Sequence, residues 1–195
     1  MGKIFCLMGK SASGKDTIYN RLLQSKELGL KHVVPYTTRP IRHGEVDGET
    51  YFFCTEEEAV QMEQAGKVIE LRAYDTVHGV WKYFTADDGQ IRLEKENYLL
   101  IGTVEAYEKI RDYFGSDQVC PIYIWVDDGV RLMRALQRER SQNEPRYAEM
   151  CRRFLADEQD FSEENLKNAG ITKRFENRDA DEVLSEISEY IRASI

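Results

Sequence analysis

Gly9-Lys10-Ser11-Ala12-Ser13-Gly14-Lys15-Asp16-Thr17 is the stretch of this 195-residue chain that decides its fold. It follows the apolar run of residues 4–8 and precedes apolar residues at helical spacing, at positions 18, 22 and 23. Glycines at both ends let the backbone curl until successive N–H groups point inward, and the following helix adds the positive end of its dipole. Lys15 supplies a mobile cation. The stretch therefore predicts a loop that binds the phosphates of a nucleoside triphosphate. A Gly- and Ser-rich turn with an unrelated lysine is disfavoured, because the spacing and both flanking elements match the full motif.

The composition is that of an ordinary enzyme domain. The chain is 42% hydrophobic and carries a net charge of −8, which argues against broad binding to nucleic acid or to an acidic membrane surface. No apolar run approaches the roughly 20 residues that span a bilayer. The four cysteines, Cys6, Cys54, Cys120 and Cys151, are scattered singly, which indicates a reducing compartment rather than a disulfide framework or a zinc site. We therefore expect a cytoplasmic protein.

Hydrophobic periodicity predicts alternating strands and helices, the pattern of an α/β fold with a parallel sheet covered on both faces. The strongest strand candidates are residues 3–8, 98–102 and 119–126, and the weaker ones are 33–34 and 173–175. A last helix is expected to begin at Asp179 or Asp181 and to bury Val183, Leu184, Ile187 and Ile191.

Two polar insertions interrupt this alternation, and they divide the chain into a core of residues 1–34, 97–128 and 169–195, a lobe of 35–96 and a helical lid of 129–168. In the lobe we expect a short strand at 51–53, a helix that opens on a capping box at Thr55, and a strand at 67–74. The lid is rich in arginine, which on its own would fit a solvated helix face. Its arginines are Arg131, Arg134, Arg138, Arg140, Arg146, Arg152 and Arg153.

The lobe also carries the pattern T-T-R-x-x-R-x-G-E-x-x-G-x-x-Y-x-F over residues 37–53. Its two arginines suit bidentate phosphate binding, and the tyrosine can close a third side of a phosphate monoester. Together with the loop G-x-S-x-x-G-K-x-T, this pattern resembles the guanylate kinase family over nearly the whole chain. The resemblance implies a three-layer P-loop NTPase fold with a central parallel sheet, a small mixed α+β lobe that binds the monophosphate, and a helical lid.

The resemblance also implies roles for individual residues. Lys15 and the lid arginines would be catalytic, and the acceptor nucleotide would be held by residues of the lobe and the core. The catalytic set is Lys15, Arg134, Arg138 and Arg153. The ATP-binding set is Gly9, Lys10, Ser11, Ala12, Ser13, Gly14, Lys15, Asp16, Thr17 and, at the adenine, Asn177. The acceptor set is Arg39, Arg42 and Tyr51 at the phosphate, Glu70 at the guanine edge, and His78, Gly79 and Thr103.

Three positions depart from the family pattern. Pro35 stands where the family carries a serine that contacts the base, Thr103 follows the third core strand where the family carries aspartate, and Asp16 stands where Ser or Thr usually ligates magnesium. We hypothesise that Asp16 and Thr17 hold the Mg²⁺ that accompanies ATP, with Glu105 assisting, so that Asp16 returns the charge that Thr103 lacks.

The expected reaction is in-line transfer of the γ-phosphoryl group of ATP to GMP or dGMP, which gives ADP and a diphosphate. A kinase of the same fold for another nucleoside monophosphate or a sugar phosphate remains an alternative, because Pro35 and Thr103 remove contacts to the base. A phosphopeptide-binding scaffold is disfavoured, because such domains usually lose the loop lysine and Lys15 is present. A regulatory GTPase is disfavoured as well, since the chain has no N-K-x-D tetrapeptide. We expect small-molecule nucleotides as partners and neither nucleic acid nor membrane, and the sequence leaves open whether a homodimer forms.

Overall fold

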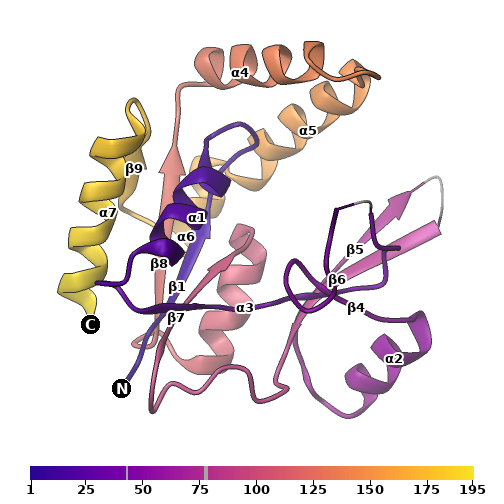
Figure 1. The fold of residues 1–195 in the computed structure, drawn as a ribbon, viewed down its shortest axis with the longest axis vertical. Coiled ribbons are helices and arrows are strands. Elements are labelled where there is room, and N and C mark those ends of the chain that lie inside the picture. Colours follow the sequence, from indigo (N-terminus) through magenta and orange to yellow (C-terminus); the bar gives the residue numbers. More distant parts are fainter. Residues whose placement is uncertain (43, 77–78) are drawn as a thin grey trace.

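The computed structural model describes residues 1–42, 44–76 and 79–195, and its centre is a five-stranded parallel sheet (Figure 1). The strands lie in the order β2-β7-β1-β8-β9, so the strand that leads into the phosphate loop is central. Each pairing in this sheet is parallel, as an α/β fold requires. The bounds are β1 Ile4–Met8, β2 Leu30–His32, β7 Asn97–Ile101, β8 Val119–Trp125 and β9 Arg174–Glu176.

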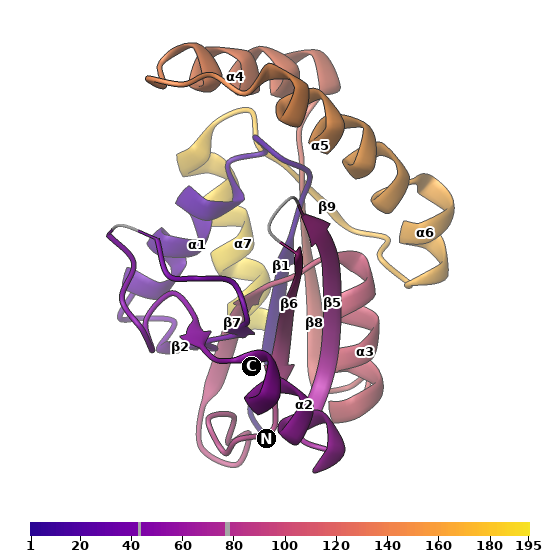
Figure 2. The same ribbon diagram turned by 90° about the vertical axis from the view of Figure 1, so that its right-hand side faces the viewer.

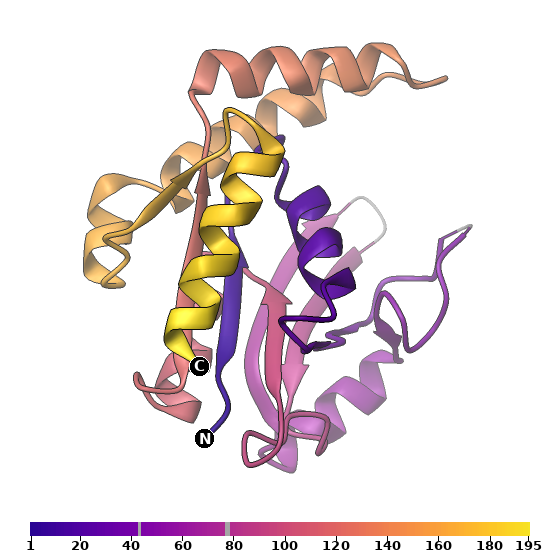
Figure 3. The ribbon, with the colours of Figure 1, turned by 60° about the vertical axis from the view of Figure 1, so that its left-hand side comes forward.

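Helices cover both faces of this sheet, which confirms the three-layer prediction (Figure 2). On one face, Phe5 and Leu7 of β1 pack with apolar residues of α1 (Lys15–Gln24) and α7 (Ala180–Ser194). On the other face, Cys6 and Met8 pack with α3 (Val104–Phe114). Figure 3 shows α7 lying along its face of the sheet. Every residue of β1 is buried, because successive side chains point into opposite layers.

The lobe is built on a second, four-stranded sheet in the order β4-β3-β6-β5. A long antiparallel hairpin of β5 and β6 forms most of it, and Ala59 of α2 packs with Phe84 and Ala86 on one face. The capping box is confirmed, since Thr55 Oγ1 accepts from Glu58 N and Glu58 Oε2 accepts from Thr55 N. The bounds are β3 Tyr36–Thr37, β4 Phe52–Phe53, α2 Glu56–Gln64, β5 Val68–Thr76 and β6 Gly79–Ala86.

Three helices follow β8, namely α4 (Asp128–Arg140), α5 (Tyr147–Asp160) and α6 (Glu163–Asn168). In Figure 1, α4 and α5 lie across the carboxyl end of the central sheet, above the phosphate loop. The chain then returns to the core, where Phe161 stacks on Tyr123 with ring centroids 5.5 Å apart and Leu166 is buried in the same cluster. Within the described ranges, no helix is long and apolar enough to cross a membrane.

The expected strand at residues 33–34 is wrong, because β2 ends one residue earlier, at His32. Val33 still donates its N–H to Leu99 O, but Val34 N donates to the side chain of Gln90. Pro35 follows and has no N–H to continue a ladder. At the other end of the chain, Asp179 rather than Asp181 caps α7, since its carboxylate accepts from the first free amides of that helix.

Candidate active site

The phosphate loop lies at the carboxyl end of β1 and turns directly into α1. Ala12 and Gly14 adopt left-handed backbone conformations, with φ of 63° and 84°, and these let the loop close on itself. A Cβ on Gly9 would lie 2.8 Å from both Ile124 O and Ser13 Oγ, so only glycine fits there. Ser13 Oγ is buried and has no hydrogen-bond partner among the described residues. The loop is thus a curled backbone with an unsatisfied hydroxyl, as expected of a phosphate cradle.

Asn177, at the end of β9, supports this loop from behind. Its Nδ2 donates to Ser13 O at 2.8 Å, and the residue is buried. Its own carbonyl accepts a long hydrogen bond of 3.4 Å from Arg134 Nη2, which ties the lid helix α4 to the same point. The structure therefore gives Asn177 a contact with the loop backbone, and its expected contact with adenine stays a prediction.

We expect Gly14→Ala to damage the loop selectively. The left-handed φ would cost about 1–2 kcal/mol for a residue with a side chain. The added Cβ would also lie 2.5 Å from Asn177 Nδ2 and force that amide off Ser13 O. Urea unfolding should show a loss of about this size, and calorimetry should show weaker ATP binding. Gly29→Ala is the matched control, because Gly29 has φ of 58° but nothing within 4 Å of an added Cβ. Equal loss of ATP binding in both variants would contradict this account.

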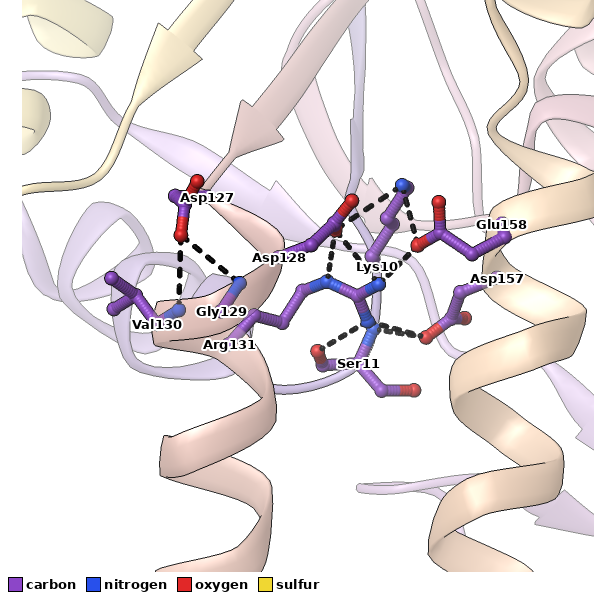
Figure 4. Close-up of polar contacts among 9 residues, drawn as sticks. All are labelled: Lys10, Ser11, Asp127, Asp128, Gly129, Val130, Arg131, Asp157 and Glu158. Carbon is purple, nitrogen blue, oxygen red and sulfur yellow. Dashed lines mark hydrogen bonds and ion pairs between the residues drawn. The ribbon is translucent and has the colours of Figure 1, made fainter.

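A buried arginine clamps the lid onto the phosphate loop (Figure 4). Arg131 of α4 is 1% exposed, and its guanidinium lies 4.1 Å from the ring centroid of Phe154. It donates to Asp128 at 2.9 Å, to Asp157 at 3.3 Å, and to Glu158. The two last carboxylates belong to α5, so one guanidinium joins both lid helices.

The same carboxylates contact the loop itself. Ser11 N donates to Asp157 Oδ2 at 2.7 Å, and Lys10 Nζ donates to Glu158 Oε1 at 2.7 Å. Lys10 also lies 3.4 Å from Asp128 Oδ1. An acidic side chain thus occupies one of the loop amides expected to bind phosphate. No local pattern in the sequence predicts Asp128, Asp157 and Glu158, because the only signal is that a buried arginine needs carboxylate partners.

Arg138 and Arg153 of the lid lie at a second cavity. Arg138 and Arg153 line a cavity of about 790 Å³ together with Arg42 of the lobe, so the structure brings three of the predicted phosphate-binding arginines around one space. Arg153 Nε donates to Glu149 Oε1 at 2.9 Å, and both Arg138 and Arg153 are exposed. Ser11 lines this cavity as well, which puts the arginines beside the loop.

A cavity of about 720 Å³ separates the lobe from the core and also reaches Ser11. Lys15 and Asp16 line it from the phosphate loop. Thr103, which caps α3 through its Oγ1, lines it from the core. The lobe contributes Tyr51, Arg72, Tyr83 and Thr85. This cavity therefore joins the predicted donor loop to the predicted acceptor lobe.

Glu70 lies behind the wall of this cavity. It is 2% exposed, and its carboxylate accepts from Arg72 Nε at 3.0 Å, Arg72 Nη2 at 3.2 Å and Thr85 Oγ1 at 2.9 Å. The expected contact with the guanine edge stays a prediction for Glu70. Arg72 was missed in the sequence, although its place two residues after Glu70 in a strand puts both side chains on one face.

Arg39, which is predicted to bind the acceptor phosphate, is also buried, at 3% exposed. It makes a bidentate pair with Glu45, with N···O distances of 2.9 and 2.8 Å, and its guanidinium lies 5.4 and 5.5 Å from the ring centroids of Tyr51 and Phe53. The Arg39 hydrogen bond is the main cause that lowers the pKa of Glu45, against the opposing effect of burial. Glu45 therefore orients the arginine beside Tyr51.

We expect this pair to make stability depend on pH. Because the pKa of Glu45 is lowered on folding, its contribution is present above the ordinary carboxyl pKa and is lost as the pH falls through the lowered value. Glu45→Gln should therefore lose about 1.5–3 kcal/mol of unfolding free energy at pH 7, the range for a hydrogen bond to a charged group. Urea unfolding of both proteins from pH 7 to pH 2 should show the difference shrinking once the pH is below the ordinary carboxyl pKa. A difference that is constant over this range would refute the role of the ionised pair.

The predicted magnesium ligands Asp16 and Thr17 lie in the first turn of α1, and both are exposed. Asp16 lines the cavity, and its Oδ1 lies 3.6 Å from Lys15 Nζ. Carboxylate and hydroxyl oxygens are the ligands that Mg²⁺ prefers, so this pair fits a metal ion that arrives with ATP. Glu105 pairs with Lys109 along α3. Of the remaining acceptor residues, Gly79 begins β6, and His78 lies outside the described residues.

Comparison with known proteins identifies the family of this chain. The family model for guanylate kinase matches residues 1–194. Guanylate kinase of Caldanaerobacter subterraneus is 40% identical over 84 residues, which are 43% of this chain and 40% of the relative. Guanylate kinase of Malacoplasma penetrans is 29% identical over 125 residues, 63% of this chain and 62% of the relative. The chain thus spans about two fifths of the length of the first of these relatives.

A crystal structure of guanylate kinase from Anaplasma phagocytophilum supports the fold. It superposes with a TM-score of 0.63 at 23% identity and covers 98% of this chain and 85% of its own. The overall fold of this chain is therefore a known architecture. From the match of the family model over residues 1–194, the chain belongs to the guanylate kinase family.

Proposed function

We propose that the protein transfers the γ-phosphoryl group of ATP to the phosphate of GMP or dGMP and releases ADP and the guanine nucleoside diphosphate. The observation that carries the proposal is the cavity that Lys15 of the phosphate loop shares with Tyr51, Arg72 and Thr85 of the lobe. A donor site and an acceptor site that open into one space are what direct transfer between two nucleotides requires.

The acceptor oxygen is already an anionic phosphate oxygen, so the chain needs no nucleophile of its own. Its task is to align two anionic substrates and to stabilise the charge that spreads over the transferred group. Lys15 is assigned to the donor phosphates. The acceptor phosphate is assigned to Arg39, Arg42 and Tyr51. Mg²⁺ held near Asp16 and Thr17 would neutralise charge on the triphosphate.

The lid arginines are assigned to the transferring group. Arg138 and Arg153 lie on α4 and α5 and line a cavity with Arg42, which is assigned to the acceptor phosphate. A positive charge placed there can stabilise the transition state. Arg134 is assigned a supporting role, since its contact is with the carbonyl of Asn177. We assign lid movement to α4 and α5, because Phe161 and Leu166 after them are packed in the core.

A coupled assay for ADP release tests the proposal. The protein with ATP and Mg²⁺ is given GMP, dGMP, AMP, UMP, CMP and a ribose bisphosphate in turn. Turnover dominated by GMP or dGMP is expected. Turnover of a different acceptor would refute guanine specificity. This specificity is the point to check, because Glu70 is buried and because Pro35 and Thr103 depart from the family pattern. Silence with every acceptor would refute the kinase and favour a phosphopeptide-binding scaffold.

A further inference from the structure

Beside Glu70, the group that lines the acceptor cavity is the guanidinium of Arg72 and not the carboxylate of Glu70. The side chain of Glu70 is 1% exposed and that of Arg72 is 17% exposed, and the described lining of the cavity includes Arg72 and Thr85. Thr85 donates its hydroxyl hydrogen to Glu70, so its proton faces away from a ligand. A base in this cavity therefore meets an arginine where the family resemblance places a carboxylate.

Arg72 is held in one orientation and keeps free donors. Its Nε and Nη2 bind the two oxygens of Glu70, at 3.0 and 3.2 Å. A guanidinium has five N–H donors in a rigid fork. Nη1 has no hydrogen-bond partner in the part of the chain that the structure describes. Because Glu70 is buried and binds Nε and Nη2, the guanidinium of Arg72 is held in this orientation. The pair is thus a fixed donor that opens into the cavity.

A fixed guanidinium selects guanine by its acceptor edge. Guanine carries two adjacent acceptors, O6 and N7, whereas adenine carries an amino donor in place of O6. Resting on the proposed function, we propose that Arg72 is a specificity-determining residue that binds the O6/N7 edge of the acceptor guanine, and that Glu70 is the residue that positions it. Arg72 then supplies a donor at a site where Pro35, another lining residue, has no hydroxyl to offer.

The wild-type protein tests this directly, through kcat/KM for GMP, IMP, 7-deaza-GMP and AMP. IMP lacks the 2-amino group but keeps O6 and N7, so we expect it to react within about threefold of GMP. We expect 7-deaza-GMP, which lacks N7, to fall about tenfold, and AMP to fall about a hundredfold or more, as for a lost bidentate base contact. If a carboxylate instead accepts from N1–H and the 2-amino group, kcat/KM falls steeply for IMP and stays close to the GMP value for 7-deaza-GMP. This pattern would overturn the inference.

Arg72→Lys provides the second arm. Lysine keeps a positive charge beside Glu70 but lacks the fork, and it avoids the unpaired buried carboxylate that alanine would leave. We expect kcat/KM for GMP to fall about tenfold to a hundredfold and the preference for GMP over AMP to fall with it, while KM for ATP stays unchanged. The matched control is Arg92→Lys, at an exposed arginine that binds Gly89 O outside the cavity.

The outcomes separate the two proposals. If wild-type protein turns over GMP and Arg72→Lys keeps the full GMP preference, the inference fails and the proposed function stands. If wild-type protein turns over no purine monophosphate but uses another acceptor, both fail. Thermal unfolding of both variants shows whether the Arg72→Lys protein is folded. If it is not folded, the analogue series on wild-type protein decides whether Arg72 binds the O6/N7 edge.

Discussion

Lys15→Ala should abolish phosphoryl transfer while the protein stays folded. The loop lysine lines the cavity, and the proposed function assigns it to the donor phosphates. Loss of one such group typically costs about 10²–10³ in rate or more. Its side chain makes an ion pair of 3.6 Å with Asp16, which is 74% exposed, so its loss should change stability little. The measurement is single-turnover transfer with saturating ATP and GMP, with thermal unfolding of the same samples.

Lys26→Ala is the matched control, because Lys26 lies exposed in the turn after α1. It should keep wild-type turnover. A collapse of thermal stability in Lys15→Ala would mean that the lysine is a structural part of the loop. Wild-type turnover in that variant would mean that the donor phosphates bind elsewhere.

Arg131→Met should release the lid from the phosphate loop. The change keeps the length of the side chain but removes the guanidinium from Asp128, Asp157 and Glu158, and Lys10 still contacts Asp128 and Glu158. Breaking a fully buried ion pair typically costs about 3–5 kcal/mol. Because Asp128 is 50% exposed and Glu158 is 38% exposed, the range for a hydrogen bond to a charged group, about 1.5–3 kcal/mol, is the better expectation here. We expect urea unfolding at pH 7 to show a loss of this order. ATP turnover should fall as well, because α4 and α5 carry Arg138 and Arg153.

The loss should depend on pH. Burial raises the pKa of Asp128, but Arg131 and Lys10 outweigh it, and the net direction is downward. The stabilisation is therefore present above the ordinary carboxyl pKa and fades as the pH falls through the lowered value. Arg140→Met, at an exposed arginine of the same helix, should leave stability unchanged. An equal loss in both variants, or one that grows toward acid pH, would contradict the clamp.

Much of the architecture follows from local sequence. The loop at residues 9–17, the apolar run before it and the helical spacing after it predict a strand, a phosphate cradle and a helix, and the structure contains this unit. The capping box at Thr55 is equally local, because its two hydrogen bonds join residues three apart. The strand expected at residues 33–34 was wrong because Gln90, distant in sequence, takes the amide of Val34.

The α/β fold and the strand, loop and helix around residues 9–17 can be inferred from the sequence alone, because each is specified by residues within a few positions of one another. Which charged side chains contact one another depends on the tertiary structure. Arg131 donates to carboxylates on α4 and α5 and, at 3.4 Å, to Ser11 O. Asn177 donates to Ser13 O across 164 residues of sequence, and Glu70 is buried behind Arg72. Such contacts depend on where distant elements pack and on which buried charge needs a partner, and no local pattern specifies either.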